Sequence, residues 1–184
     1  MPEYFFYCRD NPDTGDLRMQ LLEAHWSFMD DYADGMIARG PTLMADGLTA
    51  TGSLHIVDLP DAAAARVFAF EEPNFKAGVY AEVLIRRWRN LLGRTMWEFP
   101  GSDESRYLVI TAETDAETER RLLAEHETRL IVYGELSSDD GSKRVGSALA
   151  LEAASRGEVE ALLPDSLGRV EIHPWRFGGR PVSD

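Results

Sequence analysis

Four histidines are the side chains in this sequence best suited to move protons, and His25 has the most informative surroundings. It follows Leu17 and Leu21 at intervals of four residues, so we expect it on the apolar face of an amphipathic helix. An imidazole titrates near pH 7 and acts as a general acid or base when a neighbouring group orients it. The alternative is a histidine that packs on an apolar helix face and is satisfied by one hydrogen bond.

Asp46 and Ser53 are two further candidates, and each stands beside a glycine. Asp46 precedes Gly47, and an Asp-Gly pair is also a common turn signal without any chemical role. Ser53 is expected either to hydrogen-bond a ligand or His25, or simply to begin a strand after Gly52. No Gly-x-Ser-x-Gly elbow surrounds it, so we do not expect a serine nucleophile.

Composition and spacing argue against several other kinds of site. The histidines lie on separate predicted elements without an i, i+4 pair or a cysteine partner, which argues against zinc, although a weak His/Asp metal site stays an alternative. We expect His55 and His173 to be strand residues without a role. No glycine-rich phosphate loop is present, so no cofactor is expected. A net charge of -13 disfavours nucleic acid as a partner.

The same features bear on location. No apolar run approaches the roughly 20 residues that span a bilayer, so no membrane partner is expected. Cys8 is the single cysteine, which excludes an internal disulfide and suits a reducing compartment. We therefore expect a cytoplasmic protein.

Hydrophobic patterning places the candidates in an alternation of strands and helices. Apolar runs predict strands over residues 4–8, 42–44, 52–57 and 82–88, and helices over residues 16–38 and 62–71. The order strand, helix, strand, strand, helix, strand is that of a ferredoxin-like α+β module.

The pattern returns in the second half of the chain. The Leu-Leu-x-x-His, Asp-Gly and Gly-Ser landmarks of the first half recur there in the same order. We therefore expect two copies of one module, at residues 1–92 and 106–184, joined by a linker at residues 93–105. The second copy supplies a candidate second site formed by His126, Asp140 and Ser147.

Each module leaves one face of its sheet apolar, and that face must be covered. We expect the two modules to pack sheet to sheet as an intramolecular pseudo-dimer, with a homodimer of whole chains as a further option. Residues 96–99 of the linker are too apolar to stay in solvent, so we expect them to pack on a neighbouring element.

The first module resembles the YciI (YCII-related) family. The resemblance rests on His25, Gly40-Pro41, Asp46, residues 51–53 and the segment Pro-Asn-Phe-Lys-Ala-Gly-Val-Tyr at residues 73–80. It covers residues 3–92 well and residues 106–177 more weakly, because the second copy has only the shorter residues 164–168 in place of that segment. The family resemblance implies ferredoxin-like modules that pair into a dimeric α/β barrel.

The resemblance also implies an active site between helix and sheet. By analogy with a relative that acts as a dehydrochlorinase on a chlorinated hydroxyquinol, His25 and Asp46 would form an acid/base pair. Substrate-binding candidates are Arg18, Ser53, Phe75 and Tyr80, and Phe75 and Tyr80 are equally plausible as core residues. Arg18 matches an arginine of the family, whereas Leu22 stands where the family often has another.

These observations favour a small-molecule enzyme that performs a lyase, dehydrochlorinase or isomerase step without a cofactor. The first alternative is a non-catalytic or accessory protein that holds a small metabolite in the same cleft. The second is a purely structural interaction domain, which large apolar surface patches would support.

Overall fold

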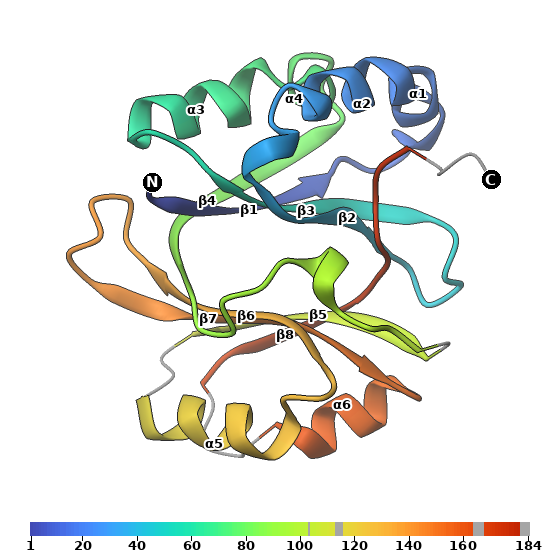
Figure 1. Ribbon diagram of the computed structural model, residues 1–184. Helices are drawn as coiled ribbons and strands as arrows, with labels where there is room; N and C mark the ends of the chain where they lie inside the picture. The colour runs from blue at the N-terminus through green and yellow to red at the C-terminus, as the bar shows by residue number, and fades with distance from the viewer. Residues whose placement is uncertain (103, 113–115, 164–167, 181–184) are drawn as a thin grey trace.

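The molecule consists of two β-sheets that lie face to face, with helices on the outer side of each sheet (Figure 1). This computed structural model describes residues 1–102, 104–112, 116–163 and 168–180. The eight strands form one closed antiparallel barrel in the order β1-β3-β2-β8-β5-β7-β6-β4.

The first half supplies four strands and the helices α1–α4. Its strands are β1 (Glu3–Asp10), β2 (Met36–Leu43), β3 (Ala50–Asp58) and β4 (Tyr80–Asn90). Its helices are α1 (Gly15–Gln20), α2 (Leu22–Asp30), α3 (Ala62–Glu71) and the short α4 (Pro73–Lys76), with a 3-10 helix at Ala33–Gly35.

The second half repeats this element order with fewer helices. Its strands are β5 (Ser105–Ala112), β6 (Leu130–Ser137), β7 (Arg144–Ala153) and β8 (Val170–Trp175), and its helices are α5 (Ala116–His126) and α6 (Arg156–Leu162). The spatial order is β4-β1-β3-β2 in the first half and β8-β5-β7-β6 in the second. In both halves the first strand therefore lies between the last strand and the third strand.

The helix predicted over residues 16–38 is wrong beyond Asp30. The chain instead turns through the 3-10 helix and enters β2, where Met36 packs under the helices and Ile37 points into the barrel. Because successive side chains of a strand point to opposite faces, the segment buries apolar side chains on both faces of the sheet. Its backbone N–H and C=O groups form hydrogen bonds with β3. The predicted strand at residues 42–44 was therefore too short and began too late.

The second half shows the same correction. The sequence pattern of the second half predicts a helix from Asp115 to about Val132, but α5 ends at His126 and β6 begins at Leu130. Leu130 packs under the helices, whereas Ile131 faces the barrel interior. In both halves a buried strand that is apolar on both faces resembles the continuation of an apolar helix, which explains the error.

The barrel interior is one apolar core shared by both halves. It includes Phe5, Leu54 and Trp88 from the first half and Leu108 and Ile131 from the second. The connection between β4 and β5 also contributes: Met96 and Phe99 are buried in this core as expected, whereas Trp97 between them is 51% exposed.

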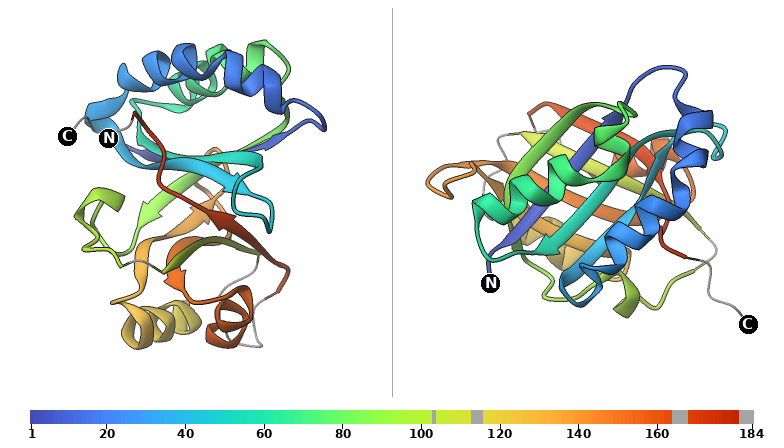
Figure 2. Two further views of the ribbon diagram at one scale, coloured as in Figure 1. Left: turned by 90° about the vertical axis from the view of Figure 1, so that its right-hand side faces the viewer. Right: turned by 90° about the horizontal axis from the view of Figure 1, so that it is seen from above.

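The C-terminal segment ties the second half to the helices of the first. After β8 the chain runs past the edge of both sheets toward α2, as both views in Figure 2 show. There the Arg180 guanidinium donates to Glu23 at 2.7 and 2.8 Å and to Asp30 at 2.8 Å. Within the described ranges, no helix combines the length and apolarity needed to cross a bilayer.

Candidate active site

A cluster of polar side chains lies between the sheet of the first half and its helices. Alternation along the strands places it there, because Ser53 and His55 point toward the helices while Leu54 and Ile56 point into the barrel. Members of this helix-side cluster come from six elements and their flanks: Cys8, Asp10, Arg18, His25, Ser53, His55, Glu72, Asn74 and Tyr80.

A contact between His25 and Glu72 forms the centre of this cluster. His25 Nδ1 lies 2.6 Å from Glu72 Oε1, and the side chains are 14% and 2% exposed. Glu72 is the N-cap of α4, where its second carboxylate oxygen accepts a hydrogen bond from the Phe75 backbone N–H at 3.0 Å. A carboxylate held in this way favours the tautomer with the proton on Nδ1.

The other ring nitrogen of His25, Nε2, has a different environment. Among the residues that the structure describes, Nε2 has no hydrogen-bond partner, and the side chain reaches solvent. An imidazole whose Nδ1–H is fixed by a carboxylate keeps a lone pair on Nε2, which is the arrangement of a general base.

Arg18, Ser53 and Tyr80 form a hydrogen-bonded chain beside the imidazole. Arg18 donates to Ser53 Oγ at 2.7 Å and to the two oxygens of Asp10 at 3.0 and 3.2 Å. The Tyr80 hydroxyl donates to Ser53 Oγ at 3.2 Å, and Asn74 Nδ2 donates to that hydroxyl at 3.3 Å. Burial raises the pKa of Tyr80 well above its usual value, so the hydroxyl keeps its proton at neutral pH.

His55 belongs to the same cluster, although it was predicted to be a strand residue without a role. Its ring centroid lies 5.7 Å from that of His25, and its side chain is buried. Burial lowers the pKa of His55 well below its usual value, so the ring is neutral at pH 7. Within the described part of the chain, His55 Nδ1 and Asn74 Oδ1 are buried without a hydrogen-bond partner.

Asp46 lies elsewhere, and Glu72 takes the place predicted for it. The Asp46 carboxylate is exposed in the loop between β2 and β3 and accepts hydrogen bonds from Leu48 N, Thr49 N and Thr49 Oγ1 at 2.8, 2.9 and 2.6 Å. These bonds lower the pKa of Asp46, whose carboxylate organises its own turn. Asp46 therefore has the contacts of an ordinary Asp-Gly turn residue. The carboxylate that contacts His25 is that of Glu72.

The candidate second site does not assemble. Asp140 is exposed in the loop between β6 and β7, where bonds from Ser138 and Ser142 hold its pKa at about 2. Ser147 is buried against Thr111, with their hydroxyl oxygens 2.9 Å apart. His126 ends α5 at the surface, with its Nε2 3.8 Å from a carboxylate oxygen of Glu125. Residues 164–167, part of the shortened segment, lie outside the described residues.

The remaining sequence candidates occupy the wall of the cluster. Phe75 packs with Cys8, Val79 and Tyr80 in a small apolar group, and its ring lies 4.9 Å from that of Phe70. Cys8 is a buried strand residue, and burial raises the pKa of its thiol well above the usual value. Across the described residues, no three His, Cys, Asp or Glu side chains are grouped as metal ligands.

Neither Glu72 nor Asn74 was predicted as a site residue, because the order Glu-Pro-Asn is typical of a break after a helix. The available signal was the order Glu-Pro-Asn, since a proline at the first helical position favours a polar cap just before it. That signal predicts a cap but does not predict that the capping carboxylate will reach a histidine 47 positions earlier.

Comparisons with known proteins give a family match in the first half of the chain. Residues 3–89 match the family model of the YCII-related domain. Comparison with curated proteins gives no match. The 5-chloro-2-hydroxyhydroquinone dehydrochlorinase TftG from Burkholderia phenoliruptrix AC1100, solved with 2,5-dihydroxybenzoquinone, is 25% identical with a TM-score of 0.47, and the match covers 50% of this chain and 98% of that one.

Two solved structures match nearly the whole chain. A mutant of chlorite dismutase from Candidatus Nitrospira defluvii is 11% identical with a TM-score of 0.56, covering 95% of this chain and 91% of that one. An anthrone oxidase-like protein is 11% identical with a TM-score of 0.54, covering 96% and 90%. At these identities the likeness concerns the barrel fold alone. Over residues 3–89, just under half of its length, the chain matches the YCII-related domain family.

Proposed function

We propose that this protein is a small-molecule enzyme in which His25, oriented by Glu72, transfers a proton. The observation that carries the proposal is the 2.6 Å contact between His25 Nδ1 and the buried Glu72 carboxylate, with Nε2 left unpaired among the described residues. Such a group suits an elimination, another lyase step or an isomerisation, in which a proton leaves a carbon or oxygen atom of a small aromatic or carbonyl compound.

The neighbouring side chains have distinct roles in this proposal. Tyr80 keeps its proton and is a hydrogen-bond donor inside the cluster, and Ser53 links it to Arg18. Arg18 is already engaged by Asp10 and Ser53, so it supports the network and adds positive potential near a developing anion. Phe75 forms an apolar wall beside Tyr80.

Proton exchange tests this proposal without knowledge of the substrate. A panel of small carbonyl and hydroxyaromatic compounds would be incubated with the protein in D2O, and loss of C–H signals would be followed by NMR. General acid–base catalysis contributes about 10²–10⁴-fold in rate, so we expect His25→Ala to reduce exchange by that factor. Glu72→Gln should reduce it less, because the amide keeps an acceptor but loses the charge.

Two control variants make the result specific to this site. Asp46→Asn and His126→Ala change the other predicted acid/base groups and should leave exchange at the parental rate. If His25→Ala exchanges every responsive compound as fast as the parent, the proposed site is wrong. Compounds that bind at the His25 cluster without any exchange would support the alternative, a non-catalytic metabolite-binding protein.

We also propose that the two halves derive from one duplicated ferredoxin-like module. Support comes from the shared element order and from the matching strand orders of the two halves. Since both halves contribute to one core, residues 1–92 alone should self-associate to cover the exposed sheet face. A stable monomer of residues 1–92 in sedimentation would count against two interdependent modules.

A further inference from the structure

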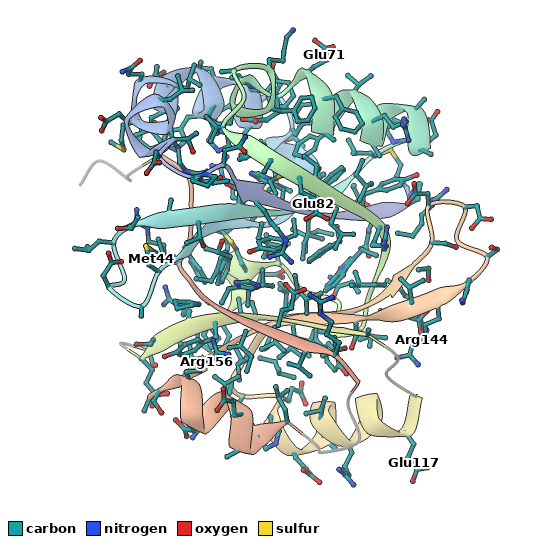
Figure 3. The ribbon with its side chains drawn as sticks, turned by 180° about the vertical axis from the view of Figure 1, so that it is seen from behind. Met44, Glu71, Glu82, Glu117, Arg144 and Arg156 are labelled. Atoms are coloured by element: carbon teal, nitrogen blue, oxygen red, sulfur yellow. The ribbon has the colours of Figure 1, made fainter. Side chains whose placement is uncertain are left out.

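A cavity lies at one end of the barrel, where the two halves meet. Its volume is about 790 Å³, within the range of small-molecule sites. Its lining comes from β1, the β2–β3 hairpin, β5, α6 and β8. Figure 3 shows Met44, in that hairpin, and Arg156, on α6, on the same side of the barrel.

The cavity lies beside the weaker of the two seams that close the barrel. Strands β4 and β6 pair through four residues on each strand, from Arg87 to Asn90. Among the described residues, β2 and β8 pair as strands at Thr42 and Trp175, and the chain after β8 stays bonded to β2 through Arg176 N to Pro41 O at 3.3 Å and Gly178 N to Arg39 O at 2.9 Å. On the other side of that pair, toward Leu43 and Pro174, side chains rather than a backbone ladder line the space between the strands. The opening is therefore a consequence of how the two halves join.

One wall of the cavity is aromatic and carries a polar pair. Tyr7, Tyr107 and Trp175 line it, and the Tyr7 hydroxyl donates to His173 Nδ1 at 3.4 Å. His173 Nε2 in turn donates to Glu171 at 3.3 Å. Both bonds are long, and His173, whose side chain is 21% exposed, is the group of this pair that a ligand oxygen could reach. Burial raises the pKa of Tyr7 and lowers the pKa of His173, which leaves a neutral donor and acceptor at pH 7.

The charged lining of this cavity is mostly cationic in a protein of net charge -13. Four arginines, Arg9, Arg106, Arg156 and Arg176, line it together with a single carboxylate, that of Asp10. Asp10 is already paired with Arg18. A cationic cleft in an acidic protein concentrates anions.

These arginines differ in how far their charge is already neutralised. Glu171 and Glu82 pair with Arg9, and the buried Glu152 pairs with Arg106 at 3.0 Å. Arg156 pairs with the exposed Glu160 at 2.9 Å, with both side chains more than half exposed, and its other partner is the uncharged Ile172 carbonyl at 2.9 Å. Arg176 has no ion-pair partner among the described residues. Arg156 and Arg176 are thus the cations with most charge left for a ligand.

We propose that this barrel-end cavity binds a small aromatic anion, such as a single-ring carboxylate. The aromatic wall receives the ring, and Arg156 and Arg176 meet the carboxylate. The cavity is separate from the His25–Glu72 contact, so this site does not depend on the proposed catalysis.

Isothermal titration calorimetry with benzoate, and with benzamide as the neutral control, tests this site. Benzoate should bind the parent protein more tightly than benzamide. Charge-assisted hydrogen bonds are lost in the double variant Arg156→Gln/Arg176→Gln, so benzoate affinity should fall by about tenfold or more. The exposed Arg66 on α3 provides a matched control, because Arg66→Gln removes the same charge away from the cavity.

The outcomes separate this inference from the proposed function. His25→Ala should bind benzoate like the parent, whereas His173→Ala should bind it more weakly in a protein with unchanged circular dichroism. Equal affinity for benzoate and benzamide, unchanged affinity in the double arginine variant, or no heat of binding at millimolar benzoate would each overturn the inference.

Discussion

The two halves of the molecule share a strand order but differ in what lies between sheet and helices. In the first half, Ser53 and His55 of β3 join the polar cluster around His25. The Gly-Ser pair of β7 places Ser147 opposite Ser53 and Leu149 opposite His55 in an alignment of the two halves. Ser147 is buried against Thr111, and Leu149 belongs to an apolar cluster. The second layer is thus an ordinary hydrophobic core, whereas the first retains buried polar groups.

The backbone requirement is common to both halves. A Cβ at Gly52 would lie 2.2 Å from the Cys8 carbonyl oxygen, and a Cβ at Gly146 would lie 1.9 Å from that of Thr111. Close strand packing therefore requires a glycine at the same place in both halves, but it does not require the polar cluster of the first half. Since burying polar groups is costly unless they are fully paired, we infer that the first half keeps its cluster for function rather than for stability.

The largest expected effect is the same in both halves. Gly52→Ala and Gly146→Ala should each lower the free energy of unfolding by about 3 kcal/mol or more, because the new methyl group meets a backbone carbonyl that cannot move aside. Urea denaturation of both variants measures this. If only one of the two alanine variants were as stable as the parent, the two halves would pack differently at this position despite their shared strand order.

Exchanging His55 and Leu149 probes the difference between the halves. Leu149→His should cost about 2–4 kcal/mol, because an imidazole would be buried in an apolar cluster. His55→Leu should change stability by less than about 1 kcal/mol or increase it, since it removes a buried nitrogen that has no partner among the described residues. Equal losses in both variants, measured by urea denaturation, would contradict the comparison.

The pH dependence of stability should also come largely from the first half. Because burial lowers the folded-state pKa of His55, the unfolded chain binds more protons at mildly acidic pH. Stability from the neutral ring is complete above the unfolded pKa of about 6.5 and is lost as pH falls below it, by at most about 1.4 kcal/mol per pH unit.

Unfolding between pH 7.5 and 5.5 measures this effect as the difference between the parent and His55→Leu. The variant should show the flatter dependence. His173, whose pKa is also lowered by burial, contributes with the same sign and stays in both proteins. An unchanged slope in His55→Leu would mean that His55 is not held neutral.

The smallest expected effect concerns the two Asp-Gly loops. Asp46→Asn and Asp140→Asn each alter an exposed carboxylate that accepts bonds only within its own turn. Both variants should unfold close to the parental temperature at pH 7, with similar small shifts in thermal denaturation. A large loss in Asp46→Asn alone would restore a special role for this residue.

Local pattern predicted much of the fold and part of the site. The apolar helix face with Leu17 and Leu21 packs as expected, and Ser155 caps α6 by accepting from Glu158 N–H. The start of β2 was missed because strand pairing overrides an apolar run that also fits a helix. Glu72 was missed because its contact with His25 depends on how α2 and α4 dock, and no local spacing encodes that distance.

The central claim is that Glu72, and not Asp46, orients the His25 imidazole. Long-range 1H–15N NMR correlations of the histidine rings, recorded where His25 is neutral, report which ring nitrogen carries the proton. We predict the proton on Nδ1 in the parent and in Asp46→Asn, with ring-nitrogen shifts that move in Glu72→Gln. A proton on Nε2 in the parent, or shifts that respond to Asp46→Asn but not to Glu72→Gln, would contradict the account.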